Sequence, residues 1–227
     1  MKTEALRLNG IPAILYGDAS NAAYLAVHGL YGCKEEAAGF AALACDRGYQ
    51  VLAIDLPEHG ERRGDGSQLL PWVVIPELQA VLRFMRSRWA RIRLYAGSLG
   101  AWFSLQGLAE EPLEKCLLVS PLLDMRRMIA GLMAQAGVTE ERLRAEGEIP
   151  MEQGQALSWR YWTFACEHPL ARWSAPTALL YGGGDQITDR ATVEGFARRF
   201  GCQLTVMEEG EHWFHTPKQL AVLKAWE

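Results

Sequence analysis

The sequence predicts an α/β fold with a mostly parallel sheet of about eight strands, an antiparallel N-terminal edge and flanking helices. Short apolar segments alternate with helix-like segments along most of the chain, which is typical of a sheet covered by helices. Asn9-Gly10 separates two short apolar segments near the N-terminus and indicates a hairpin, hence the antiparallel edge. A chain of 227 residues accommodates one such domain with a full core.

The individual elements follow from apolar runs and from the residues that punctuate them. The expected strands are short apolar runs, at residues 5–8, 12–16, 23–27, 50–56, 92–95, 115–119, 177–181 and 203–207. The expected helices of the main alternation are longer and mix apolar with charged residues, at 35–47, roughly 75–89, 99–108, 190–200 and from 216 onward. Gly48 suits the end of the first helix, and Thr216 with Pro217 suits the start of the last.

The alternation lapses between residues 124 and 173. This stretch reads as short helices at 126–135, 140–146 and 153–167, and it carries several methionines and aromatic residues. Because strands resume on both sides of it, we expect a single domain over 1–227 with a helical cap inserted at 124–173.

Composition excludes several classes of function. The chain is 49% hydrophobic and 22% charged, which indicates a globular protein, and its net charge of -4 argues against nucleic acid as the main partner. No apolar run suggests a signal peptide or a membrane span, so a cytoplasmic protein without a membrane partner is expected. The five cysteines are scattered and indicate reduced thiols. Whether two copies form a homodimer stays open.

Ser98 lies in Ala96-Gly97-Ser98-Leu99-Gly100, between an expected strand and an expected helix. A sharp turn there needs small neighbours, and the N-terminus of the following helix favours a developing anion. Such a turn presents a reactive serine at the carboxyl edge of a sheet. Ala96 replaces the first glycine of the usual pattern, and the alternative interpretation is a serine that only caps the helix.

A serine nucleophile needs a base, and the base needs a carboxylate to orient it. Asp185 follows the expected strand at 177–181, and His212 follows the expected strand at 203–207, so both should reach the edge that carries Ser98. The order serine, acid, histidine also fits a triad on this kind of sheet. Asp185 and His212 are therefore the expected acid and base.

Each assignment has an alternative. Asp124 follows the strand at 115–119 and is the rival acid, although Asp185 fits the expected chain order better. His215 is the rival base, but it abuts the start of the last helix. His28 and His59 are expected to shape loops by hydrogen bonding, because buried polar groups are usually satisfied. We expect no metal site and no cofactor, since no pattern of metal ligands occurs.

The remaining requirement is a pair of N–H donors for the oxyanion of a tetrahedral intermediate. The backbone N–H of Leu99, directly after the serine, is one expected donor. The second is expected from the loop at 28–32, with Leu30 as the donor residue. Backbone atoms suffice for this role, so leucine is acceptable at both positions.

Five motifs together resemble one known superfamily. They are His28-Gly29-Leu30-Tyr31-Gly32, residues 55–62, Ala96-Gly97-Ser98-Leu99-Gly100, Tyr181-Gly182-Gly183-Gly184-Asp185 and Gly210-Glu211-His212-Trp213. With them the chain resembles the α/β-hydrolase fold superfamily, in particular small bacterial carboxylesterase-like serine hydrolases. The resemblance implies Ser98 as nucleophile, Asp185 as acid and His212 as base. Residues 55–62 are also similar to loops of the prolyl-oligopeptidase-like branch.

The expected function is cleavage of a small-molecule carboxylic ester through an acyl-enzyme intermediate. Methionine and aromatic residues at 124–173 suggest a substrate that is apolar or aromatic near its carbonyl, although they also suit ordinary packing. The same machinery would serve a peptidase or a thioesterase. A hydrolase-fold protein that binds a ligand without turnover is the alternative from another class, and a cofactor-free lyase or peroxidase-like activity is a third.

Overall fold

A computed structural model describes residues 1–151 and 156–226 of the chain. The chain divides into two compact units. The larger comprises Met1–Leu123 and Arg172–Glu227, and the smaller comprises Asp124–Ala171. The smaller unit nearly coincides with the stretch in which the strand–helix alternation lapses. That it acts as a cap stays a prediction.

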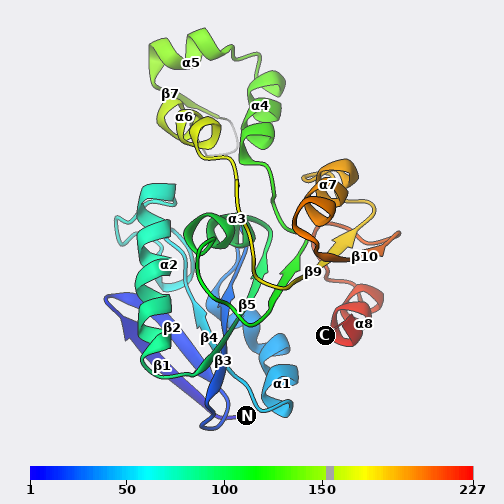
Figure 1. The fold of residues 1–227 in the computed structure, drawn as a ribbon. Coiled ribbons are helices and arrows are strands. Elements are labelled where there is room, and N and C mark those ends of the chain that lie inside the picture. The colour runs from blue at the N-terminus through cyan, green and yellow to red at the C-terminus, as the bar shows by residue number, and fades with distance from the viewer. Residues whose placement is uncertain (152–155, 227) are drawn as a thin grey trace. The chain divides into compact units, whose positions relative to one another are not determined.

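The larger unit is built on one sheet whose strands follow the order β1-β2-β4-β3-β5-β6-β9-β10 (Figure 1). These strands are Thr3–Leu8, Ile11–Tyr16, Ala22–Val27 (β3), Gln50–Ile54 (β4), Arg91–Gly97, Cys116–Val119, Thr177–Gly182 and Gln203–Met207. β1 and β2 form the antiparallel hairpin, β2 pairs antiparallel with β4, and the remaining pairs are parallel. The predicted fold class is confirmed.

Helices cover both faces of this sheet. They are α1 (Ala38–Asp46), α2 (Pro71–Arg86), α3 (Ser98–Gly107), α7 (Arg190–Phe200) and α8 (Pro217–Trp226), with short 3-10 turns at Lys34–Ala37 (η1) and Gly60–Arg62 (η2). α1 and α8 lie on one side of the sheet, and α2 with α3 on the other (Figure 1). Strands β3, β4 and β9 are buried along their whole length, as expected for strands covered on both faces.

The smaller unit contains α4 (Met125–Gln135), α5 (Glu140–Glu146), α6 (Trp159–Glu167) and a two-stranded ribbon of β7 (Glu148–Pro150) with β8 (Ala156–Ser158). The predicted helix at 153–167 is wrong at 156–158, which form β8, and residues 153–155 lie outside the described residues. The Ser158 side chain accepts a hydrogen bond from the Tyr161 backbone N–H, and this N-cap starts α6 at Trp159.

Two other boundaries differ from the sequence prediction. The helix expected at about 75–89 begins at Pro71, whose fixed φ and missing N–H suit the first helical position. The strand expected at 50–56 ends at Ile54, because the chain there turns into the loop that carries Asp55. No helix among the described residues is long and apolar enough to cross a membrane.

Candidate active site

The carboxyl edge of the parallel strands gathers the predicted site residues of the larger unit. His28 follows β3, Ser98 follows β5, Asp185 lies just beyond β9, and His212 lies beyond β10. In the sheet, β3 pairs with β5, while β9 lies between β6 and β10, so these segments flank Ser98 from both sides. This edge is where open α/β sheets bind ligands.

Ser98 occupies a sharp turn between β5 and α3. Its φ is 46°, a left-handed conformation that is uncommon for a residue with a side chain. The next residue, Leu99, lies in the first turn of α3, whose N–H groups have no intrahelical acceptor. The Leu122 N–H donates to the Ser98 carbonyl oxygen at 3.1 Å and helps to hold the turn.

Left-handed backbone is concentrated at this edge of the sheet. Among the described non-glycine residues, positive φ occurs at Asn9 in the hairpin turn and at Tyr31, Glu58, Ser98 and Ser120. The last four follow β3, β4, β5 and β6, which are four adjacent strands. Each such residue costs about 1–2 kcal/mol relative to ordinary backbone. Strain of this kind is typical of functional sites.

The side chains of Ser98, His212 and Asp185 form one hydrogen-bonded chain. His212 Nδ1 lies 2.7 Å from Asp185 Oδ2, and His212 Nε2 lies 2.8 Å from Ser98 Oγ. A carboxylate only accepts, so the imidazole N–H is at Nδ1, which leaves the Nε2 lone pair facing the serine hydroxyl. His212 Nε2 is therefore placed to remove the hydroxyl proton of Ser98.

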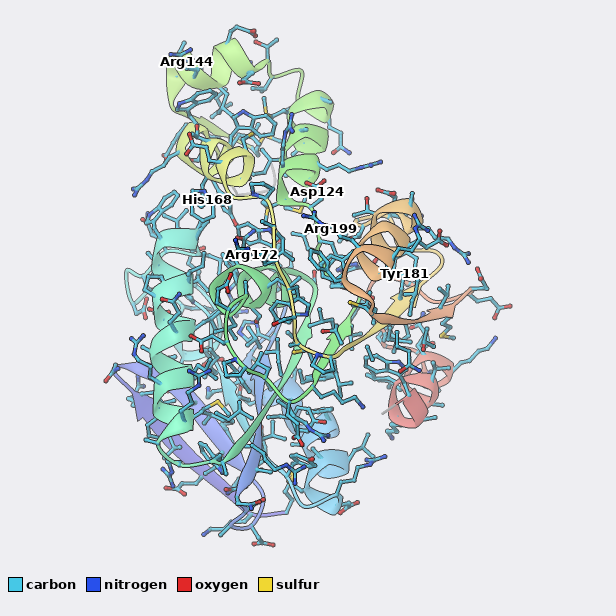
Figure 2. All side chains as sticks on the ribbon, viewed as in Figure 1. Asp124, Arg144, His168, Arg172, Tyr181 and Arg199 are labelled. Carbon is cyan, nitrogen blue, oxygen red and sulfur yellow. The ribbon has the colours of Figure 1, made fainter. Side chains whose placement is uncertain are left out.

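Asp185 is fixed by its own loop. Its side chain is fully buried, and Oδ1 accepts the backbone N–H groups of Ile187 at 2.7 Å and Thr188 at 3.1 Å. The Tyr181 hydroxyl, on β9 (labelled in Figure 2), donates to the Thr188 carbonyl at 2.8 Å. The second carboxylate oxygen, Oδ2, is thereby left directed at His212.

The rival acid and base have other partners. Asp124 is exposed and is the N-cap of α4, where its Oδ1 accepts the Arg127 N–H at 2.9 Å (Figure 2). The exposed His215 places Nδ1 2.8 Å from the Trp213 carbonyl oxygen and stacks on the Trp213 ring. The acceptor for the His212 Nδ1–H is Asp185 Oδ2.

The loop at 28–32 packs directly against the serine. A side-chain carbon added to Gly29 would lie 3.0 Å from Ser98 Cβ and 3.7 Å from Ser98 Oγ. One added to Gly100, in the first turn of α3, would lie 2.2 Å from the His28 carbonyl oxygen. The absence of side chains at these two glycines thus allows α3 and the 28–32 loop to meet. Leu30 directly follows Gly29 in the sequence, and Leu99 directly precedes Gly100.

His28 and His59 bind backbone amides in each other's loops. The Leu56 N–H donates to His28 Nε2 at 3.1 Å, and the Tyr31 N–H donates to His59 Nε2 at 2.9 Å. The other ring nitrogens, both Nδ1, lie 2.7 Å from the carbonyl oxygens of Gly29 and Pro57. The prediction that the two histidines shape loops is confirmed.

A buried ion pair behind the same loops was missed in the sequence. Lys34 Nζ lies 2.8 Å from Asp55 Oδ2, with side-chain exposures of 2% and 0%. Asp55 also accepts the backbone N–H groups of Lys34 and Glu61. Burial lowers the pKa of the Lys34 ammonium, but hydrogen bonds to Asp55, Glu61 and Glu35 outweigh burial and raise it above its ordinary value. The sequence signal was an acidic residue directly after an apolar strand.

Within residues 1–151 and 156–226, no cluster of three or more histidine, cysteine, aspartate or glutamate side chains could hold a metal ion. The five cysteines form no disulfide. Burial raises the pKa of the Cys116 thiol to about 12, which keeps this residue an inert core thiol.

Comparison with known proteins places the chain in a family. The profile of the alpha/beta hydrolase family matches residues 25–224, and the chain belongs to this family. A comparison with curated protein sequences found no match.

Solved structures show the same fold at low sequence identity. Est1E from Butyrivibrio proteoclasticus, solved with ferulic acid bound, is 16% identical with a TM-score of 0.76, covering 98% of this chain and 95% of its own. Alpha/beta hydrolase domain-containing protein 10 from mouse is 14% identical with a TM-score of 0.78, covering 100% and 96%. A putative hydrolase from Agrobacterium vitis S4 is 17% identical with a TM-score of 0.75, covering 99% and 97%.

Proposed function

We propose that the protein is a serine hydrolase that cleaves small carboxylic esters through an acyl-enzyme intermediate. The observation that carries the proposal is the hydrogen-bonded chain from Asp185 through His212 to Ser98, with distances of 2.7 and 2.8 Å. Membership of the alpha/beta hydrolase family supports it.

In this mechanism Ser98 Oγ attacks the ester carbonyl while His212 Nε2 takes the hydroxyl proton. His212 then returns that proton to the departing alcohol, and a water molecule repeats the sequence to release the acid. Asp185 keeps the imidazole N–H at Nδ1 and stabilises the imidazolium that forms. The backbone N–H groups of Leu30 and Leu99 donate to the oxyanion of each tetrahedral intermediate.

The substrate is proposed to be apolar or aromatic near the reacting carbonyl. Of the five large apolar side chains that are exposed among the described residues, three lie within two residues of a proposed site residue. Trp213 is 72% exposed and directly follows His212, and Tyr31 is 74% exposed and directly follows Leu30. Ile187 is 52% exposed, and its N–H binds Asp185. These side chains offer apolar surface to an aromatic acyl or alcohol group.

The test is labelling with a fluorophosphonate probe, followed by intact mass and peptide mapping. One adduct on Ser98 is expected in the wild type, with none in Ser98→Ala. Turnover of aryl acetates, butyrates and benzoates should fall by on the order of 10⁴ or more in Ser98→Ala and His212→Ala. A wild type that stays unlabelled and inert on these esters would instead indicate a ligand-binding protein.

The acid is tested by two matched substitutions. Asp185→Asn should lower turnover by on the order of 10⁴, because the amide no longer holds the required histidine tautomer. Asp124→Asn should leave turnover close to wild type. If the Asp124 change alone abolishes activity, the assignment of the acid is wrong. Matched thioester and amide substrates in the same assay show whether the reaction extends to thioesterase or peptidase chemistry.

A further inference from the structure

The peptide groups on either side of Leu30 are each held by a histidine. A peptide group is planar, and its N–H and C=O point in opposite directions. The Leu30 N–H shares its peptide group with the Gly29 carbonyl, which lies 2.7 Å from His28 Nδ1. The Tyr31 N–H shares its peptide group with the Leu30 carbonyl and donates to His59 Nε2 at 2.9 Å. Each peptide plane that flanks Leu30 is therefore held by an imidazole ring, and the Gly29 carbonyl also accepts the Gly32 N–H at 3.2 Å.

The protonation state of both rings follows from their partners. A backbone N–H can only donate, so His28 Nε2 and His59 Nε2 must each carry a lone pair. The Nδ1 atoms face carbonyl oxygens and must carry the hydrogen. Each ring is thus a neutral imidazole that donates from Nδ1 and accepts at Nε2.

The surroundings of His28 favour this neutral form. Burial lowers the pKa of His28 to about 4, against an opposing contribution from its hydrogen bond to Gly29. The adjacent His59 imidazole also lowers the pKa, while the carboxylates of Asp55 and Glu35 raise it. The two rings lie 5.1 Å apart between centroids, so two positive charges there would repel.

We propose that His28 and His59 are positioning residues that aim the Leu30 N–H at the oxyanion, each by holding one of the peptide groups that flank Leu30. This inference rests on the proposed function, because it assigns a role in that reaction. In this proposal His28 and His59 support catalysis through the Leu30 peptide groups, and neither contacts the substrate.

Asparagine and glutamine substitutions separate the two nitrogens of each ring. The asparagine amide lies near the position of Nδ1, and the glutamine amide near the position of Nε2. For His28 the contact to the Leu30 peptide is made by Nδ1, so His28→Asn should retain more activity than His28→Gln. For His59 the contact is made by Nε2, so the order reverses and His59→Gln should retain more than His59→Asn.

The readout is kcat and KM on an aryl butyrate. The poorer variant of each pair should lose on the order of 100-fold in kcat, comparable to losing one oxyanion donor, while the better variant stays within about 10-fold of wild type. KM should change little, because the oxyanion is absent from the bound ester and forms only as the reaction proceeds. A purely structural role of His28 through its bond to Leu56 predicts the opposite order for His28, because that bond is made by Nε2.

Failure of this inference is distinguishable from failure of the proposed function. If Ser98→Ala hydrolyses esters as fast as wild type, the proposed function fails. If Ser98→Ala is inactive but all four histidine variants keep wild-type kcat, or the crossed order is absent, only the positioning role is overturned.

A second measurement does not depend on whether the variants fold. Long-range ¹H–¹⁵N correlation spectra of the wild type at pH 7 report the tautomer of each histidine. Neutral rings with the hydrogen on Nδ1 are expected for both His28 and His59. An Nε2–H tautomer or an imidazolium at either residue would overturn the proposal.

Discussion

Replacing Gly100 by alanine should damage catalysis by moving backbone, without removing any chemical group. The new Cβ would lie 2.2 Å from the His28 carbonyl oxygen and 2.7 Å from the Val27 carbonyl oxygen. Both atoms belong to backbone, so no side chain can swing away. An ordinary contact begins near 3.4 Å, so α3 and the end of β3 must separate by roughly 1 Å.

That displacement would move the two proposed oxyanion donors apart, because Leu99 lies in α3 and Leu30 lies in the loop that follows β3. A misplacement of about 1 Å costs on the order of 100-fold in rate, and overpacking of this kind destabilises by about 1–3 kcal/mol. Gly100→Ala should therefore lower kcat/KM on an aryl butyrate by about 100-fold while the protein stays folded. Circular dichroism and the urea midpoint check the fold.

The matched control is Gly195→Ala in α7. Gly195 has no neighbouring atom within 4 Å of an added Cβ, and alanine is the better helix former by up to about 1 kcal/mol. This variant should keep wild-type kcat/KM and unfold at a slightly higher urea concentration. A Gly100→Ala enzyme within threefold of wild-type kcat/KM would refute the reasoning that this contact positions the donors.

Three further changes test the loops and a helix of the larger unit. Lys34→Met leaves the buried Asp55 carboxylate without its cation and should cost about 3–5 kcal/mol in urea unfolding; a loss under 1 kcal/mol would contradict this. The pKa of His28 is about 4 in the folded protein, below its ordinary value of 6.5, so the unfolded chain binds the proton more readily. Stability should fall by about 2 kcal/mol between pH 7 and pH 5, and His28→Asn should lack this component of the slope. Asp189→Ala removes the N-cap of α7 and should cost about 1 kcal/mol with unchanged kcat/KM, measured by unfolding and ester hydrolysis.

Local patterns in the sequence were sufficient to predict the strands of the sheet. They were also sufficient to pick out Ser98, Asp185 and His212, the three side chains that hydrogen bonds join in the candidate site. The predicted ranges of α7 and β10 agree with the structure at both ends, because Asp189 and Gly201 mark the helix limits chemically. The N-terminal hairpin agrees in type and pairing, because Asn9-Gly10 specifies the turn. The positions of Asp185 and His212 followed from the strands that precede them.

The differences come from contacts between distant residues. β8 has three residues, too few for a visible alternation, and it exists because it pairs with β7. The start of α2 is a different case: it has no side-chain cap, and Pro71 at the first helical position was a local signal that the sequence prediction did not use. The crossed histidine contacts join residues 28 positions apart, and the Lys34–Asp55 pair joins residues 21 positions apart. Contacts between loops this far apart in the sequence cannot be predicted from a local pattern.

The four left-handed residues at the carboxyl edge imply a trade-off between stability and activity. Glycine adopts their conformation at no steric cost, so Glu58→Gly or Ser120→Gly would relieve about 1 kcal/mol each. The same substitution at Ser98 would relieve its backbone strain but would also remove the proposed nucleophile. Under selection for heat resistance alone, Ser98→Gly would be favoured in the same way as Glu58→Gly and Ser120→Gly, although it abolishes the proposed reaction.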